Sequence, residues 1–164
     1  MKSSAVCFSG HRPYRLPQNK EDIDNLKIKL YRAVDKAVNE GYLTFYQGGC
    51  IGFDLLCAMA VITRKKRKKE TDKGEIRLIA ALPFKNQAEK WSKKDKEIYE
   101  EILSYCDEII FLSENYNKGC YHIRNRYMVD NSDKLICYFD GSSGGTKYTV
   151  EYAEEKGLEI ENLF

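Results

Sequence analysis

The alternation of short apolar runs with amphipathic stretches constrains the fold of this chain more than any other feature. The apolar runs are bounded mostly by Gly, Asp, Asn or Ser and lie at residues 5–9, 43–47, 76–82, 108–112 and 135–139. Runs this short between turn-forming residues favour buried strands over helices. Apolar residues at three- and four-residue spacing predict helices in the stretches after them, at residues 23–37, 53–67, 86–105, 121–131 and 146–156.

Strands that alternate with helices need crossover connections, and these produce a parallel sheet covered on both sides. We therefore predict an α/β, Rossmann-like three-layer domain with a mainly parallel sheet of about five or more strands and helices on both faces. A length of 164 residues fits one domain over residues 1–164.

Composition excludes several classes of protein. Hydrophobic residues make up 43% and charged residues 32%, as in globular proteins, and the net charge of +2 predicts no class of partner. No apolar run approaches the ~20 residues of a membrane span, and the first residues lack a signal-peptide pattern, so we expect a cytoplasmic protein. With 6 cysteines in no CxxC pair and 2 histidines, we expect reduced thiols, no metal site and no required cofactor.

Ligands of such sheets bind beyond the carboxyl ends of the strands, so the strand-to-helix junctions are the places to search. The first junction contains Ser9, Gly10, His11 and Arg12. A glycine here permits close approach of the backbone to a ligand, and the two basic side chains suit an anion. An ordinary loop with solvated charges is an equally weighted alternative. A GxGxxG fingerprint is absent, which argues against a standard NAD-dependent dehydrogenase.

The second junction contains Gly48, Gly49 and Gly52, followed by Asp54 in the first helical turn. Glycines between a strand and a helix suit backbone amides that bind phosphate or ribose. Asp54 either complements the helix dipole or accepts a hydrogen bond from a ribose hydroxyl.

The fifth junction contains Asp140, Gly141, Gly144, Gly145 and Thr146. It combines a flexible loop with the positive end of a helix, which resembles a phosphate cradle, although the Walker A pattern does not fit. Two glycine-rich turns at strand ends predict one shared cleft.

Other candidates lie between these turns. Pro83 ends a strand, and Phe84 offers a ring for stacking a base, although core packing is the better interpretation of Phe84 alone. Arg124 and Arg126 stand near the start of a helix, where cations are unfavourable, so a ligand anion is a reason for one of them.

A run of six basic residues covers 64–69. Such a run is typical of a nucleic-acid patch. It also ends a predicted helix, where cations are favoured and usually solvated, and we favour the solvated helix end.

Taken together, the junctions resemble the YpsA-like branch of the SLOG superfamily, the Rossmann-like group that also contains the LOG and DprA proteins. The matches occur in consistent order over about residues 4–157 and comprise Ser9 to Pro13, Gly48-Gly49 with Gly52 to Asp54, Pro83-Phe84 with Gln87 and Trp91, Arg124-Asn125 with Tyr127 to Asp130, Ser132-Asp133, and Asp140-Gly141 with Gly144 to Thr146. The resemblance implies a nucleotide-derived ligand at the glycine turns, with Gln87 and Asn125 among its binding residues.

The resemblance also bears on chemistry. LOG proteins resemble phosphoribohydrolases, whose pattern places a glutamate thought to be catalytic three residues after Gly-Thr. In this chain that position is Thr149, while Arg124 matches the arginine of the pattern. Glycoside cleavage needs a carboxylate, for which Asp54 and Asp140 are the candidates.

Three hypotheses follow, in order of preference. The first is binding of a nucleotide or an NAD- or ADP-ribose-like compound by a sensor or regulator. The second is cleavage of a nucleotide N-glycosidic bond, with the catalytic residue drawn from those two aspartates. The third is DprA-like binding of single-stranded DNA through the basic run, and a homo-oligomer is compatible with all three.

Overall fold

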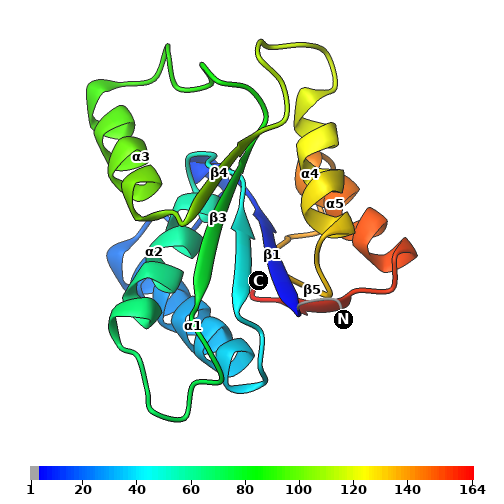
Figure 1. The fold of residues 1–164 in the computed structure, drawn as a ribbon. Helices are drawn as coiled ribbons and strands as arrows, with labels where there is room; N and C mark the ends of the chain where they lie inside the picture. Colours follow the sequence, from blue (N-terminus) through cyan, green and yellow to red (C-terminus); the bar gives the residue numbers. More distant parts are fainter. Residues whose placement is uncertain (1–3) are drawn as a thin grey trace.

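The computed structural model describes residues 4–164 as a parallel six-stranded sheet between two layers of helices (Figure 1). The strands stand in the order β4-β3-β2-β1-β5-β6. Their bounds are β1 Ala5–Gly10, β2 Thr44–Gln47, β3 Arg77–Leu82, β4 Glu108–Phe111, β5 Lys134–Tyr138 and β6 Glu159–Asn162. The predicted Rossmann-like α/β class is confirmed.

The helices cover both faces of the sheet, and the face changes where the chain reverses its direction across the strands. Figure 1 shows α1 (Lys20–Asn39), α2 (Phe53–Lys66) and α3 (Lys93–Tyr105) on one face, and α4 (Cys120–Asp130) and α5 (Gly145–Glu155) on the other. A short 3-10 turn, η1 (Pro13–Arg15), follows β1. The chain runs outward from β1 to β4 and then returns over the other face to β5. The strand order therefore reverses between β1 and β5, the position at which open α/β sheets form a crevice.

The central strand β1 shows why the apolar runs are continuous rather than alternating. Val6 and Phe8 are fully buried in the core beneath α1 and α2, while Cys7 is fully buried in the core beneath α4 and α5. A parallel strand covered on both faces must be apolar at every position. The same arrangement makes the carboxyl end of β1 the floor of the crevice.

Two elements differ from the sequence prediction. The third helix begins at Lys93 rather than near residue 86, because Ser92 caps it by accepting a hydrogen bond from Asp95 N at 3.2 Å. Trp91 therefore lies before the helix, where its ring packs 5.1 Å from that of Tyr99. The sixth strand was not predicted, since its four residues mix charged and apolar side chains and lie at the edge of the sheet.

The prediction that the basic run is a solvated helix end is wrong for Arg64. This side chain is fully buried, and its Nε donates to Asp35 Oδ1 at 2.7 Å. Its Nη1 and Nη2 donate to the two carboxylate oxygens of Asp72 at 3.0 and 2.5 Å. Arg64, the first residue of the run, therefore connects the loop that follows α2 to α1.

Three lysines of the run also have carboxylate partners. Lys65 lies 2.6 Å from Asp107, Lys68 lies 3.7 Å from Glu75, and Lys69 lies 2.9 Å from Asp35. Within residues 4–164, ion pairing therefore leaves only Lys66 and Arg67 of this run without a carboxylate partner.

The Arg64 network predicts a measurable contribution to stability. Arg64→Met should lower the free energy of unfolding at neutral pH by roughly 2 kcal/mol or more, because it leaves the two aspartates without their shared cation. Hydrogen bonds from Arg64 lower the pKa of Asp72 from 3.8 to about 2. The stabilisation is therefore fully present above about pH 4 and is lost as the pH falls toward about 2.

Urea denaturation of both proteins over that pH range tests the prediction, and the difference between them should shrink on acidification. The control is Arg77→Met, which breaks a half-exposed ion pair with Glu108 and should cost less than about 1 kcal/mol. An equal loss in both variants would contradict the assigned role of Arg64.

Candidate functional site

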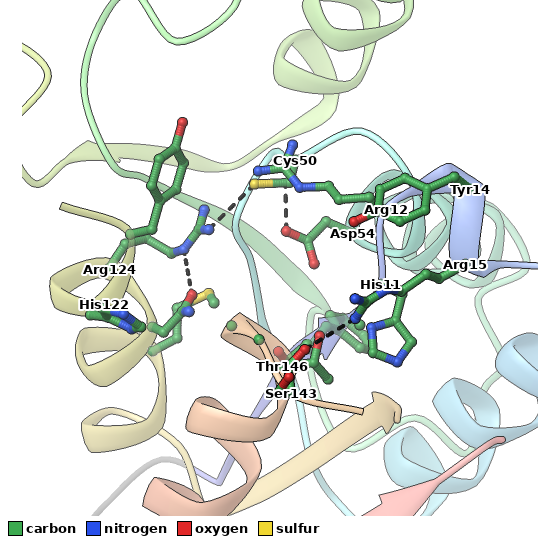
Figure 2. Close-up of a pocket in the computed structure, with 18 residues that line it drawn as sticks. His11, Arg12, Tyr14, Arg15, Cys50, Asp54, His122, Arg124, Ser143 and Thr146 are labelled. Carbon is green, nitrogen blue, oxygen red and sulfur yellow. Dashed lines mark hydrogen bonds between the residues drawn. The ribbon is translucent and has the colours of Figure 1, made fainter. Parts of the chain in front are cut away.

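A cavity of about 360 Å³ opens at the carboxyl edge of the sheet, between the ends of β1 and β5 and the helices that follow the strands (Figure 2). It therefore occupies the point at which the strand order reverses. Its walls come from the end of β1 and η1, the β2–α2 loop and the start of α2, one side of α4, and the β5–α5 loop and the start of α5. They comprise Phe8, Ser9, Gly10, His11, Arg12, Tyr14, Arg15, Cys50, Asp54, Tyr121, His122, Arg124, Asn125, Met128, Ser143, Gly144, Gly145 and Thr146.

The structure brings ten of the predicted site residues together in this lining: Ser9, Gly10, His11, Arg12, Asp54, Arg124, Asn125, Gly144, Gly145 and Thr146. The other eight lie outside it: Gly48, Gly49, Gly52, Pro83, Phe84, Gln87, Asp140 and Gly141. Arg126, the second arginine considered for an anion, is exposed and also lies outside the lining.

The second glycine turn packs against protein rather than against the cavity. A Cβ atom on Gly48 would overlap the Arg124 guanidinium, and one on Gly49 would lie 2.6 Å from a methyl group of Leu82. Gly52 has a φ of +105°, and a Cβ atom there would lie 2.7 Å from the carbonyl oxygen of His11. These glycines permit close contact between the β2–α2 loop and its neighbours, which explains their number without a ligand.

Phe84 and Gln87 likewise contact protein. The Phe84 ring packs edge-on against Tyr116 and Tyr121 at 5.7 and 6.3 Å. The buried Gln87 amide donates to the Tyr99 hydroxyl at 3.1 Å. The packing interpretation of Phe84 agrees with these contacts, and Tyr121 links it to the cavity wall.

Arg124 forms one wall of the cavity and is only 4% exposed. Its Nη1 donates to the Gly48 carbonyl oxygen at 2.5 Å. Its Nε donates to Asn125 Oδ1 at 2.7 Å and its Nη2 to Cys50 Sγ at 3.3 Å (Figure 2). The guanidinium is held by α4 and bonded to the β2–α2 loop, so its position is fixed before any ligand arrives.

Asp54 contributes the only carboxylate among the lining residues, and it is buried. One of its oxygens accepts a hydrogen bond from Cys50 N at 3.3 Å. Burial raises the pKa of Asp54 above its usual value, although Arg124 and Arg12 nearby act in the opposite direction. A carboxyl group in this state is suited to holding a proton that other aspartates have lost.

Asp140, the other candidate carboxylate, has an environment unlike that of Asp54. Its carboxylate accepts hydrogen bonds from the backbone and hydroxyl of Ser142 and lies 3.0 Å from His11 Nε2. These interactions, with those of Ser142 foremost, lower its pKa to about 2. Asp140 is therefore an ionised link between the β1 and β5 loops, and its low pKa suits a hydrogen-bond acceptor rather than a proton donor.

The start of α5 presents backbone donors to the cavity. Gly144, with a φ of +140°, is the N-cap residue and supplies no side-chain cap. The amides of the first helical turn therefore have no partner within the helix, and the helix dipole makes this end positive. Arg15 holds the loop in place by donating to Ser142 Oγ at 3.0 Å and to the Ser143 carbonyl oxygen at 3.2 Å.

Several lining residues were missed by the sequence reasoning, chiefly Tyr14, Arg15, Cys50, Tyr121, His122 and Ser143. The Arg12 and Arg124 guanidinium groups lie 6.0 and 5.8 Å from the Tyr121 ring, so this tyrosine joins both cations. Proximity to the motifs was the available signal for Arg15 and Ser143. The same signal existed for Tyr121, which precedes Arg124 by three residues on α4, whereas its contact with Arg12 comes from a distant segment.

Thr149, at the position of the LOG glutamate, is buried and its hydroxyl donates to the Gly145 carbonyl oxygen at 3.0 Å. It stabilises the first turn of α5 and brings no carboxylate to the cavity. Among residues 4–164, no group of three or more His, Cys, Asp or Glu side chains is arranged to hold a metal ion. No helix in this part of the chain has the length and apolar character needed to cross a membrane.

Comparison with known families and relatives gives a consistent result. The YpsA family model, described as the YspA SLOG family, matches residues 6–162. A UPF0398 protein of Bacillus cereus is 28% identical over 163 residues, covering 96% of this chain and 85% of the relative. The uncharacterized SPbeta prophage-derived protein YoqJ of Bacillus subtilis is 30% identical over 146 residues, covering 81% and 82%.

Solved structures extend the similarity of fold. DNA processing protein A (DprA) from Streptococcus pneumoniae superimposes with a TM-score of 0.65 at 17% identity, covering 98% of this chain and 50% of that one. DprA from Helicobacter pylori, solved for its single-stranded DNA binding mode, gives 0.62 at 16% identity, covering 98% and 65%. This chain thus spans half to two thirds of those proteins, and the comparison establishes a shared fold.

The two glycine environments predict opposite effects of one substitution. Gly10→Ala should destabilise the protein by about 1–3 kcal/mol, because its Cβ atom would overlap the buried Phe53 side chain. Gly145→Ala places its Cβ atom in open space at a negative φ and should leave stability unchanged or raise it by about 0.4–1 kcal/mol. Thermal unfolding of both variants measures the difference, and equal destabilisation would contradict the packing role of Gly10.

The environment of Asp54 predicts its titration. Carbon-13 NMR of the aspartate carboxyl groups should give Asp54 a midpoint above the ordinary value of 3.8, because burial outweighs the nearby guanidinium groups. Arg124→Met should raise that midpoint further, since it removes the nearest favourable charge. A midpoint below the ordinary value would mean that ion pairing, not burial, dominates the site.

Proposed function

The chain belongs to the YspA SLOG family, and from that premise and its cavity we propose that it binds a nucleotide-derived ligand, with a phosphate at the start of α5. The observation that carries the proposal is the position of the cavity. It lies where the strand order reverses, and the uncapped, positive end of α5 faces it. In α/β sheets this combination binds nucleotide phosphates.

The charge of the lining supports an anionic ligand. Arg12, Arg15 and Arg124 are present together with one aspartate, and burial favours the neutral form of that aspartate. Arg124 is engaged by protein acceptors. The Arg12 side chain has no hydrogen-bond or ion-pair partner within the described residues and is exposed in the cavity lining, so it is the cation best suited to meet a phosphate.

The size and aromatic content of the cavity support a nucleoside. A volume of about 360 Å³ falls within the range of small-molecule sites, roughly 300–1,000 Å³. Tyr14 and Tyr121 supply rings in the lining, and Tyr14 is 73% exposed, which leaves its ring available to stack on a base.

Cleavage of an N-glycosidic bond is the second candidate function, and the environment of Asp54 favours it. A buried carboxyl group with a raised pKa in the lining has the properties of a general acid. Thr149 supplies no carboxylate, and of the two candidate aspartates Asp54 is the one in the cavity lining, so we assign the role of general acid to Asp54. Single-stranded DNA binding has weaker support, because carboxylates neutralise most of the basic run.

Calorimetric titration with AMP, ADP-ribose, NAD, cyclic nucleotides and inorganic phosphate tests the proposal. At least one nucleotide should bind, and Arg12→Ala should weaken its binding about tenfold by removing a charge-assisted hydrogen bond. Arg126→Ala, which removes an exposed arginine of α4 outside the lining, should leave the affinity unchanged.

Two results would contradict the proposal: binding by no member of the panel, or equal affinity in the Arg12→Ala variant. Chromatography of the same mixtures separates the two candidate functions. Release of free base by the unaltered protein that is lost in Asp54→Asn indicates cleavage, whereas nucleotide that stays intact indicates binding alone.

A further inference from the structure

The outer face of α2 carries an apolar stripe on the side of the molecule away from α4 and α5. Leu56, Met59, Ala60 and Thr63 repeat at intervals of three and four residues and so lie along one face of the helix. Met59 at its centre is 49% exposed. Ala60 is buried in the core and Leu56 packs against it, but Met59 turns to the surface, where a middle helix of a layer ordinarily carries polar side chains. Packing within the chain therefore leaves the exposure of Met59 unexplained.

The neighbouring helices convert the stripe into two adjoining grooves. A groove of about 460 Å³ between α1 and α2 includes Ile28 and Tyr31. A second of about 290 Å³ between α2 and α3 includes Ile98 and Tyr105. Met59 lines both, and Ile28 and Tyr105 are 48% and 43% exposed. The two grooves share Met59 and so adjoin on the layer formed by α1, α2 and α3, whose arrangement Figure 1 shows.

Cations surround this surface. Lys27, Arg32 and Arg67 line the first groove, and Lys66 lines the second. Within residues 4–164 none of the four forms an ion pair with a carboxylate. Glu101 is the one carboxylate in the lining of the two grooves.

Two of these cations lie over tyrosine rings at the groove edges. Lys66 Nζ lies 4.7 Å from the centroid of the Tyr105 ring, and the Arg67 guanidinium lies 5.4 Å from that of Tyr31. They are also the two residues of the basic run that have no carboxylate partner. Four residues of the run thus form ion pairs within the fold, whereas Lys66 and Arg67 border the apolar surface.

We propose that this surface docks an amphipathic helix of another protein, with apolar residues at helical spacing flanked by Glu or Asp. Shape and apolar character fit a helix lying along α2. Charge complementarity selects the acidic flanks. A second copy of this chain would oppose cations to cations, and a nucleic acid would leave the Met59 stripe uncovered.

Fluorescence anisotropy with synthetic peptides tests the proposal. The probe is a labelled 18-residue helical peptide, about five turns long, with Leu at positions i, i+3, i+4 and i+7 and Glu on its flanks. A peptide with Lys in place of Glu and a scrambled peptide of the same composition serve as comparisons. The Glu-flanked peptide should bind at least about tenfold more tightly than either.

Matched variants locate the binding. Met59→Glu and the double variant Lys66→Glu/Arg67→Glu should each weaken binding about tenfold or more. Ile123→Glu and Arg126→Glu, at exposed positions of α4 on the opposite layer, should leave it unchanged. Circular dichroism establishes that each variant is folded, and the exposure of Met59 makes its substitution tolerable.

Several outcomes would overturn the proposal. Equal binding of the Glu- and Lys-flanked peptides would remove the charge argument, and peptide binding insensitive to Met59→Glu would place it elsewhere. A dimer in sedimentation that Met59→Glu dissociates would identify a second copy as the occupant. Binding of a single-stranded oligonucleotide, lost in the Lys66→Glu/Arg67→Glu variant but kept in Met59→Glu, would identify nucleic acid instead.

Discussion

The structure at the carboxyl edge of the sheet depends on the hydrogen bonds of the buried Arg124 guanidinium. The guanidinium is carried by α4, on one face of the sheet, yet it bonds to the carbonyl of Gly48 and the thiol of Cys50 in the loop leading to α2 on the other face. A buried cation without such acceptors would be prohibitively costly, so the loop must present its backbone to it. Gly48 permits that approach because any side chain there would occupy the space of the guanidinium.

This constraint shapes the cavity as well as the packing. Arg124 is held in one wall by protein acceptors, and Asp54 is buried beside it with a pKa that burial raises. The opposite side, made by η1 and the start of α5, carries the exposed arginines and the free amides. A ligand anion therefore meets exposed arginines and backbone amides on one side and the buried Arg124 on the other.

The helix α2 links the cavity to the rest of the molecule through three different surfaces. Its first turn carries Asp54 into the cavity, its inner face fills the core with residues such as Val61, and its outer face bears the Met59 stripe. At its end, Arg64 turns inward to two aspartates. An almost wholly apolar helix with a basic end is thus explained by its central place in one layer.

The sequence by itself determined five of the strands, the helices apart from the start of the third, and the edge of the sheet at which the cavity lies. These depend on local quantities, namely the period of apolar residues and the glycines that end strands. Family resemblance distinguished Arg124 from Arg126, although it did not give the partners of Arg124. Only the tertiary structure decided which glycines line the cavity and which pack against protein, that Arg64 is buried, and that Arg15 and Tyr121 belong to the site. Each of these depends on contacts between residues far apart in sequence, such as Arg15 with Ser142 and Arg124 with Gly48, whose geometry no local pattern contains.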